Sequence, residues 1–194
     1  MTDPLKEDLR QYLQYARDSV VRSLDGLSEY DVRRPLVPSG TNLLGVVKHL
    51  VGIELTYFGE CVGRPAPVTL PWVEDGSIWQ SADMWATPEE SREHMLGLYR
   101  TAWRHSDEAL ASLGLDAPAR VGWWAEGKRD TTFGHLVVRL VEETAHHAGH
   151  CDVVRELIDG RGGRDSSDVG DERWWSAYVA KIQAAAETFG TPQP

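Results

Sequence analysis

In the stretch TTFGHLVVRLVEETAHHAGHCDVVRELIDG, residues 131–160, three of the chain's seven histidines and two glutamates fall within nine residues. Thr131 or Thr132 can cap the start of a helix here, and Gly160 is a natural stop. Apolar residues recur between these limits at helical spacing, namely at Leu136, Leu140, Cys151, Val154 and Ile158. The stretch therefore predicts a long amphipathic helix that ends near residues 159–160.

The ionisable side chains of this helix divide between its two faces. With about 100° of rotation per residue, His147 falls inside the apolar stripe, and Glu143 and His150 fall at its edges. His146 and Glu142 fall on the polar side. We therefore predict that His147 faces the core, whereas His146 mostly faces water.

Helical spacing also marks four other segments, at residues 5–27 and, approximately, at residues 42–61, 87–112 and 172–188. No strand-like alternation lasts for more than a few residues. Four long amphipathic helices and a short last one predict an all-α fold, a four-helix bundle formed by a single domain over residues 1–194. Residues 62–86 and 113–130 are expected to be long loops.

Two of these helices have start signals of their own. Thr41 or Asn42 can cap the second helix. The sequence TPEE combines a cap at Thr87, a proline at the first helical position and a glutamate, Glu90, that closes a capping box. It predicts that the third helix begins at residue 87.

The net charge of −10 argues against nonspecific binding to nucleic acid and to anionic membranes. No apolar run approaches the ~20 residues that span a bilayer, and the first twenty residues lack the apolar centre of a signal peptide. We expect a cytoplasmic protein that binds neither nucleic acid nor membrane. Cys61 and Cys151 form no CxxC pattern and are expected to be buried thiols.

Glu143 and His147 lie one helical turn apart, so a simple hydrogen bond between them could explain the pair. A metal site is the alternative, and two observations favour it. His150 lies one turn further along, and the second helix offers His49 on an apolar face. Two imidazole nitrogens and a carboxylate that meet inside a bundle would suit a divalent ion such as Zn²⁺, Ni²⁺, Fe²⁺ or Mn²⁺.

The other histidines and the tryptophans are weaker candidates. His94 and His105 are expected at the surface, and His135 is expected to be structural or to line the same cavity. Three tryptophans on predicted helices are expected to pack in the core or between helices: Trp103, Trp174 and Trp175. The others lie in or beside the long loops and could wall a substrate pocket or only anchor the loops: Trp72, Trp79, Trp85, Trp123 and Trp124.

The segments VVKHLVGIELTYFG, residues 46–59, and HLVVRLVEETAHHAGHCDVVRELIDG, residues 135–160, resemble the DinB/YfiT-like superfamily and, within it, the DUF664 branch. The resemblance implies a four-helix bundle of up-down-down-up topology, often dimeric, with a three-ligand metal site. Matching the motif places the ligands at His49, Glu143 and His147. His150 could join them, replace Glu143, support them or act as a catalytic base.

The resemblance also implies a class of reaction. Characterised relatives include S-transferases that use low-molecular-weight thiols such as mycothiol or bacillithiol, and a thiol-dependent maleylpyruvate isomerase. A divalent metal, with zinc as the first choice, can bind such a thiol as thiolate. We therefore expect a thiol-dependent transferase or isomerase that acts on a small electrophile. Two alternatives stay open: a hydrolase that uses metal-bound water, and a metal- or ligand-binding stress protein without turnover.

Overall fold

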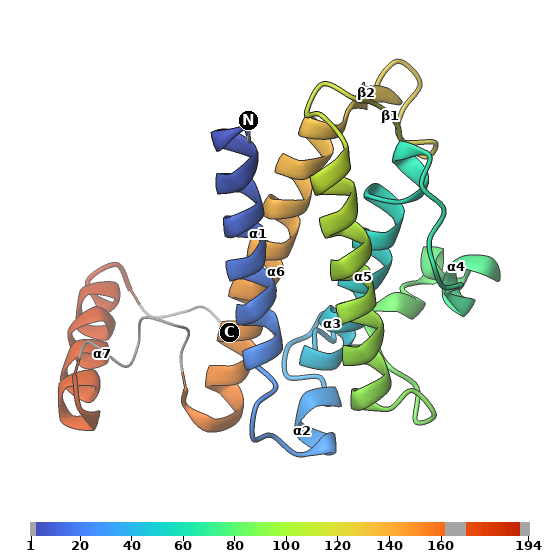
Figure 1. Ribbon diagram of the computed structural model, residues 1–194. Coiled ribbons are helices and arrows are strands. Elements are labelled where there is room, and N and C mark those ends of the chain that lie inside the picture. The colour runs from blue at the N-terminus through green and yellow to red at the C-terminus, as the bar shows by residue number, and fades with distance from the viewer. Residues whose placement is uncertain (1–2, 162–169, 191–194) are drawn as a thin grey trace.

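The computed structural model describes residues 3–161 and 170–190 (Figure 1). Its long helices are α1 (Pro4–Arg22), α3 (Leu43–Tyr57), α5 (Arg92–Ser112), α6 (Phe133–Asp159) and α7 (Glu172–Glu187). The shorter elements are α2 (Glu29–Arg33), η1 (Glu60–Val62), α4 (Pro71–Glu74), η2 (Ser77–Gln80), η3 (Ala82–Met84) and the strands β1 (Pro118–Arg120) and β2 (Asp130–Thr132).

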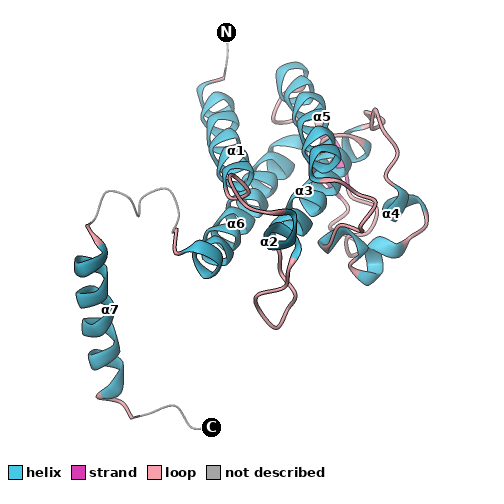
Figure 2. Ribbon diagram, turned by 90° about the horizontal axis from the view of Figure 1, so that it is seen from below, coloured by secondary structure: helices cyan, strands magenta, loops and turns pink. Residues whose placement is uncertain are grey.

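Four of the long helices form the predicted bundle. α1 and α6 run in one direction, and α3 and α5 run in the other (Figure 1). α1 packs along α6, and α3 packs against both α5 and α6. Seen from below, α1, α3, α5 and α6 group together, with α4 to one side (Figure 2). The all-α fold and its up-down-down-up topology are therefore confirmed.

The two helices that carry the candidate ligands begin at residues with a capping side chain. Asn42 caps α3 by accepting a hydrogen bond from the backbone N–H of Gly45, and Thr132 caps α6 by accepting one from the N–H of His135. α6 ends at Gly160, whose φ of 74° is the left-handed conformation that glycine adopts without strain. The predicted starts of both helices are confirmed, with Asn42 and Thr132 chosen from the two pairs, and so is the end of α6. The predicted end of the second helix near residue 61 is wrong, because α3 ends at Tyr57 and the separate helix η1 follows it.

The predicted start of the third helix is wrong. α5 begins at Arg92, and Ser91 is its cap. Glu90 does accept a hydrogen bond from the N–H of Thr87, as a capping box would require, but its carboxylate also binds the ammonium of Lys48 at 2.8 Å. The sequence TPEE therefore forms a turn that is held against α3, and the helix starts only after it.

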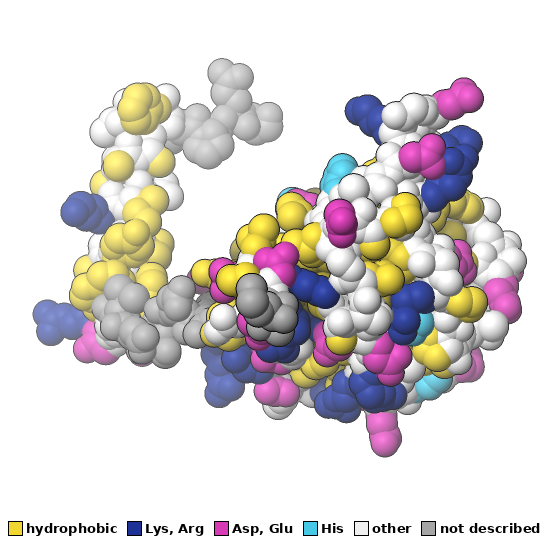
Figure 3. Space-filling model, turned by 45° about the horizontal axis from the view of Figure 1, so that its top comes forward, with side chains coloured by type: hydrophobic (Ala, Val, Ile, Leu, Met, Phe, Trp, Pro, Cys, Tyr) yellow, Lys and Arg dark blue, Asp and Glu magenta, His cyan; other side chains and the backbone are white. Residues whose placement is uncertain are grey.

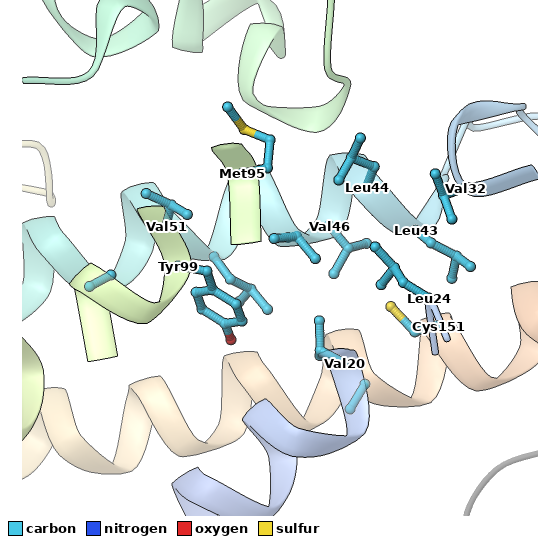
Figure 4. Close-up of a cluster of buried hydrophobic side chains, with 14 of the residues drawn as sticks. Val20, Leu24, Val32, Leu43, Leu44, Val46, Val51, Met95, Tyr99 and Cys151 are labelled. Atoms are coloured by element: carbon cyan, nitrogen blue, oxygen red, sulfur yellow. The ribbon is translucent and has the colours of Figure 1, made fainter. Parts of the chain in front are cut away.

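The core of the bundle is apolar and includes residues from α1, α3, α5 and α6 (Figure 4). Val20 of α1 and Leu24, which follows the end of α1, meet Val46 of α3, Tyr99 of α5 and Cys151 of α6 in this cluster. A second cluster surrounds Phe58 and Phe133, whose rings are 4.9 Å apart. The two clusters fill the bundle on both sides of a buried ion pair between Arg17 of α1 and Glu54 of α3.

Both cysteines are buried free thiols, as predicted. Cys61 is 5% exposed, and Cys151 is fully buried. Burial raises the pKa of each thiol to about 12. Because the thiolate is the nucleophilic form, neither cysteine is suited to react at neutral pH.

The two long connections contain short elements that the sequence pattern did not reveal. Residues 62–86 form α4, η2 and η3, which lie beside α3. In the second connection, β1 and β2 pair as an antiparallel hairpin, with Pro118 opposite Thr132 and Arg120 opposite Asp130. Strands of three residues are too short to show alternation of apolar and polar side chains.

α7 confirms the predicted last helix, but none of its side chains is buried. Trp174 and Trp175 pack on each other, with ring centroids 4.9 Å apart, and Trp174 stacks on Tyr178. The expectation that they pack in the bundle core is wrong, since Trp174 is 40% exposed. Trp103 of α5 is half-buried against Tyr99, as expected.

The surface is mixed in charge. On the face shown in Figure 3, lysine and arginine side chains are interspersed with aspartates and glutamates. No helix among residues 3–161 and 170–190 is long and apolar enough to cross a membrane.

Candidate metal centre

The candidate metal centre lies where α3 and α6 face each other. His49 projects from α3, and Glu143 and His147 project from successive turns of α6. The Nε2 atoms of His49 and His147 each lie 3.3 Å from Oε1 of Glu143, and the three side chains are between 13% and 21% exposed. The structure thus brings the three predicted ligands together on a partly open side of the bundle.

His147 lies at the edge of the buried face of α6 and not at its centre. The centre of that face includes Thr144 and Ala148, which are small and buried. α1 packs along α6. His147 therefore keeps an approach from solvent while its ring contacts His49, with centroids 4.9 Å apart.

The donor set fits a divalent ion. One potential ligand atom from each of His49, Glu143 and His147 lies within 4.8 Å of the others, and no other such group of three occurs in the described part of the chain. A tetrahedral zinc ion with bonds of 2.0–2.1 Å would place its ligand atoms about 3.3–3.4 Å apart. The two measured separations of 3.3 Å agree with that spacing.

Asp83 supports His49 from the opposite side. Its Oδ2 atom lies 2.6 Å from Nδ1 of His49, and the aspartate is buried. Burial alone would lower the pKa of His49, but the contacts with Asp83 and Glu143 raise it to about 9. The two carboxylates therefore favour an imidazolium at neutral pH, and Nε2 of His49 must lose a proton before it can bind an ion.

Asp83 reaches His49 because η3 lies very close to α3. A Cβ atom at Gly45 would sit 1.9 Å from the carbonyl oxygen of Met84, so this approach requires glycine. The Asn42 side-chain amide donates to the same oxygen at 3.1 Å, and the Lys48 ammonium donates to the Trp85 carbonyl at 3.1 Å. These contacts fix the segment that carries Asp83.

Glu143 is held as a carboxylate. Its contacts with His147 and His49 keep its pKa well below the usual range, although burial opposes them. The other oxygen, Oε2, lies 3.6 Å from the guanidinium of Arg139, one turn earlier on α6. An ionised carboxylate between two imidazoles is the form that binds a cation.

Comparison with known protein families finds a match over most of the chain. The sequence model of a family described as Mycothiol-S-transferase matches residues 8–160. The chain belongs to the mycothiol S-transferase family. The matched range includes α6 with both of its candidate ligands and ends before α7.

A solved structure shares the fold of this mycothiol S-transferase family member. The crystal structure of a conserved protein from Enterococcus faecalis has a TM-score of 0.62 and 10% sequence identity, and the likeness covers 82% of this chain and 100% of that one. At that identity the likeness concerns the fold alone. No curated protein matches the sequence.

In this mycothiol S-transferase family member, the remaining residues of the histidine cluster lie further from the candidate metal centre. His146 and Glu142 are 60% and 61% exposed and lie 3.8 Å apart on the polar side of α6, as predicted. His150 is exposed, and its ring centroid is 5.4 Å from that of His147. Burial and the neighbouring His146 and His147 lower the pKa of His150. It lies outside the group of three potential ligands.

The other histidines divide between surface and core. His94 is exposed, as predicted, but His105 is only 8% exposed. The prediction for His105 is wrong because its ring lies beside Gly59, where a Cβ atom would approach Nε2 to 3.2 Å. His135 is exposed. Its ring is tilted against that of Trp124, with centroids 5.5 Å apart, and its Nδ1 atom shares a hydrogen bond with the Thr131 hydroxyl.

The tryptophans of the long loops take different positions. Trp72 is buried under Lys48, whereas Trp79 and Trp85 are exposed. Trp123 and Trp124 lie next to Tyr57 of α3, with ring centroids 5.6 and 6.3 Å apart. Of these five tryptophans, Trp123 and Trp124 are the ones that contact Tyr57, whose hydroxyl contacts Arg139 beside Glu143.

Two residues near the candidate centre were absent from the sequence prediction. Asp83 has no signal in the sequence, because it lies 34 positions from His49 in a segment without periodicity. Arg139 did have a signal in the sequence, since it lies four residues before Glu143 on the same helical ridge.

Proposed function

We propose that the protein is a divalent-metal-dependent enzyme that joins a low-molecular-weight thiol, of the mycothiol type, to a small electrophile or uses it to isomerise one. The observation that carries the proposal is the meeting of His49, Glu143 and His147 within hydrogen-bonding reach in a chain of the mycothiol S-transferase family. Zinc is the first choice of metal, with nickel, iron and manganese as alternatives.

In this proposal the side chains of the centre divide the work. His49, Glu143 and His147 hold the ion, and Asp83 fixes the orientation of the His49 ring. The bound ion would supply one effect, a lower pKa for the thiol, so that its sulfur is available as thiolate at neutral pH. The open side of the site, where the three side chains are partly exposed, admits both substrates.

We assign to His150 the role of accepting the thiol proton. Its pKa is lowered, so its imidazole is neutral at neutral pH and can accept a proton. The sulfur then forms a bond to the electrophilic carbon, and the displaced electron pair leaves with the leaving group or, in an addition, passes into the conjugated system. His150 is exposed and can pass its proton to water.

A thiol panel tests the proposed chemistry. The metal-loaded protein is incubated with a generic haloarene electrophile and with mycothiol, bacillithiol or glutathione, and thioether formation is followed by absorbance. We expect thioether to form fastest with mycothiol or bacillithiol. Electrophile consumption that needs no thiol would indicate a hydrolase instead, and inertness of fully loaded protein would indicate a binding protein without turnover.

The Asp83→Asn substitution tests the support of the metal ligand. It keeps the size of the side chain but removes the charge that orients the His49 ring, so we expect metal affinity to fall about 10–100-fold. Competition with a coloured chelator measures the affinity. The matched control is Asp75→Asn, which alters an exposed aspartate of the same connection. An unchanged affinity in Asp83→Asn would contradict the role given to this contact.

A homodimer is part of the same proposal. Large apolar side chains on the outer side of α1 support it, since Leu5 is 59% exposed and Tyr12 is 63% exposed. Light scattering of the purified protein tests it through the molar mass in solution.

A further inference from the structure

A cation and three aromatic rings lie beside the candidate metal centre. We call this group the Arg139 cluster: Arg139 of α6, Tyr57 of α3, and Trp123 and Trp124 of the second long connection. The guanidinium carbon of Arg139 lies 5.6 Å from the centroid of the Tyr57 ring and 6.0 Å from that of Trp124. Its Nε atom donates to the Tyr57 hydroxyl at 3.0 Å. The hydrogen bond from Nε and the contacts of the guanidinium with the aromatic rings therefore hold the arginine in place.

Among the described residues, the guanidinium of Arg139 makes only some of the hydrogen bonds that its nitrogens could donate. Its Nη2 atom approaches Glu143 at 3.6 Å, and among the described residues Nη1 has no hydrogen-bond acceptor. The side chain is 40% exposed. By contrast, Arg155 donates from three nitrogens to Asp159 and to two backbone carbonyls. Within the described part of the chain, Nη1 of Arg139 is thus without a hydrogen-bond partner, and Nη2 has only the long contact with Glu143.

The surroundings of Arg139 favour a planar anion. A guanidinium binds a carboxylate through two parallel hydrogen bonds, and aromatic rings accept the flat face of an unsaturated ligand. Trp123 is 44% exposed, so one ring of the cluster is open to such a ligand. The net charge of −10 repels anions elsewhere, so a local cation is needed to hold one.

A groove elsewhere in the structure does not offer the same chemistry. A groove of about 450 Å³ lies between the end of α3 and residues 63–74. Its lining includes the carboxylates of Glu60 and Glu74 and no lysine or arginine among the described residues. Such a groove would repel an anion, in contrast to the Arg139 cluster. Two other hollows have basic residues in their linings, but each also contains at least two carboxylates.

We propose that the Arg139 cluster is the subsite for the electrophile, and that it selects aromatic or conjugated carboxylates. The carboxylate pairs with Nη1 and Nη2 of Arg139, and the flat part of the ligand lies against Tyr57 and the two tryptophans. Glu143 is one turn further along α6, so the rest of the ligand extends toward the candidate metal centre. The identity of this subsite as part of an enzyme rests on the proposed function, but its binding of a carboxylate does not require the metal.

Benzoate binding to chelator-treated protein tests the subsite. Tryptophan fluorescence reports the binding, and Trp124→Phe shows how much of the signal comes from the cluster. We expect benzoate to bind at least about tenfold more tightly than neutral benzamide, and Arg139→Gln to remove that advantage, because a charge-assisted hydrogen bond is lost. Arg139→Lys keeps the charge without the fork and should fall between the two.

Arg120→Gln is the matched control, since Arg120 is exposed on β1 and pairs with Asp130. It should bind benzoate as the unaltered protein does, and thermal melting shows whether each variant folds. Equal binding of benzoate and benzamide, or an Arg139→Lys variant that folds and binds like the unaltered protein, would overturn the proposal. Binding that appears only after metal loading would also overturn it, because the carboxylate would then be a metal ligand. Failure of thiol transfer alone would leave the result intact.

Discussion

Replacing His147 by alanine is expected to abolish stoichiometric metal binding and, with it, any thiol transfer. The substitution removes one of the three potential ligands and leaves Glu143 with only His49 as a neighbouring donor. Loss of a residue that merely orients a ligand typically costs about 10–100-fold in affinity, so loss of a ligand itself should cost more. Elemental analysis of protein purified without chelator measures the effect.

The neighbouring histidine supplies the matched control. His146 has the same side chain at the adjacent position of α6, but it is 60% exposed, its charged neighbour is Glu142, and it lies outside the group of three potential ligands. His146→Ala should therefore retain the metal content of the unaltered protein. If unaltered protein takes up no metal, or if His147→Ala retains as much as His146→Ala, the candidate centre does not bind metal through these residues.

The Glu54→Gln substitution is expected to destabilise the bundle by about 3–5 kcal/mol, because a buried guanidinium loses its only buried carboxylate partner among the described residues. Arg17 of α1 is fully buried and binds both oxygens of Glu54 on α3, at 2.6 and 2.9 Å, and also Asp107 of α5 at 2.9 Å. Burial alone would lower the pKa of Arg17, but the carboxylates raise it above its usual value. Urea unfolding at constant slope measures the loss.

Two further variants separate a lost partner from a general loss of packing. The double substitution Arg17→Met and Glu54→Leu removes both charges, and we expect it to recover much of the stability lost in Glu54→Gln. Glu7→Gln breaks the exposed pair between Glu7 and Arg10 and should leave the unfolding midpoint unchanged. A Glu54→Gln protein as stable as the unaltered one would show that the buried pair does not contribute to stability.

The helices that form the bundle were predictable because their signals are local. The apolar spacing of residues 136–158 and the caps at Asn42 and Thr132 act within a few residues, so the sequence contains them directly. The start of α5 was not predictable for the opposite reason. The carboxylate of Glu90 is shared with Lys48, which lies 42 positions away, and this contact turns a capping signal into a turn.

The candidate site shows the same division between local and distant contacts. The ridge on α6 singled out His147 over His146, and the apolar face of the second helix indicated His49. The family resemblance then implied the same ligands. Asp83 depends on the close approach of Met84 to Gly45, which arises only when η3 packs on α3. Its role could therefore be found only from the folded structure.

Arg139, Glu143 and His147 follow one another along a single ridge of α6, so the proposed subsite would limit the length of the substrate. Each step of four residues advances about 6 Å along the helix axis. If the carboxylate of an electrophile is bound at Arg139, the atom that meets the sulfur must lie about one helical turn from that carboxylate. Short conjugated acids, with the reactive carbon a few bonds from the carboxylate, match this length, and acids in which a longer chain separates the two groups do not.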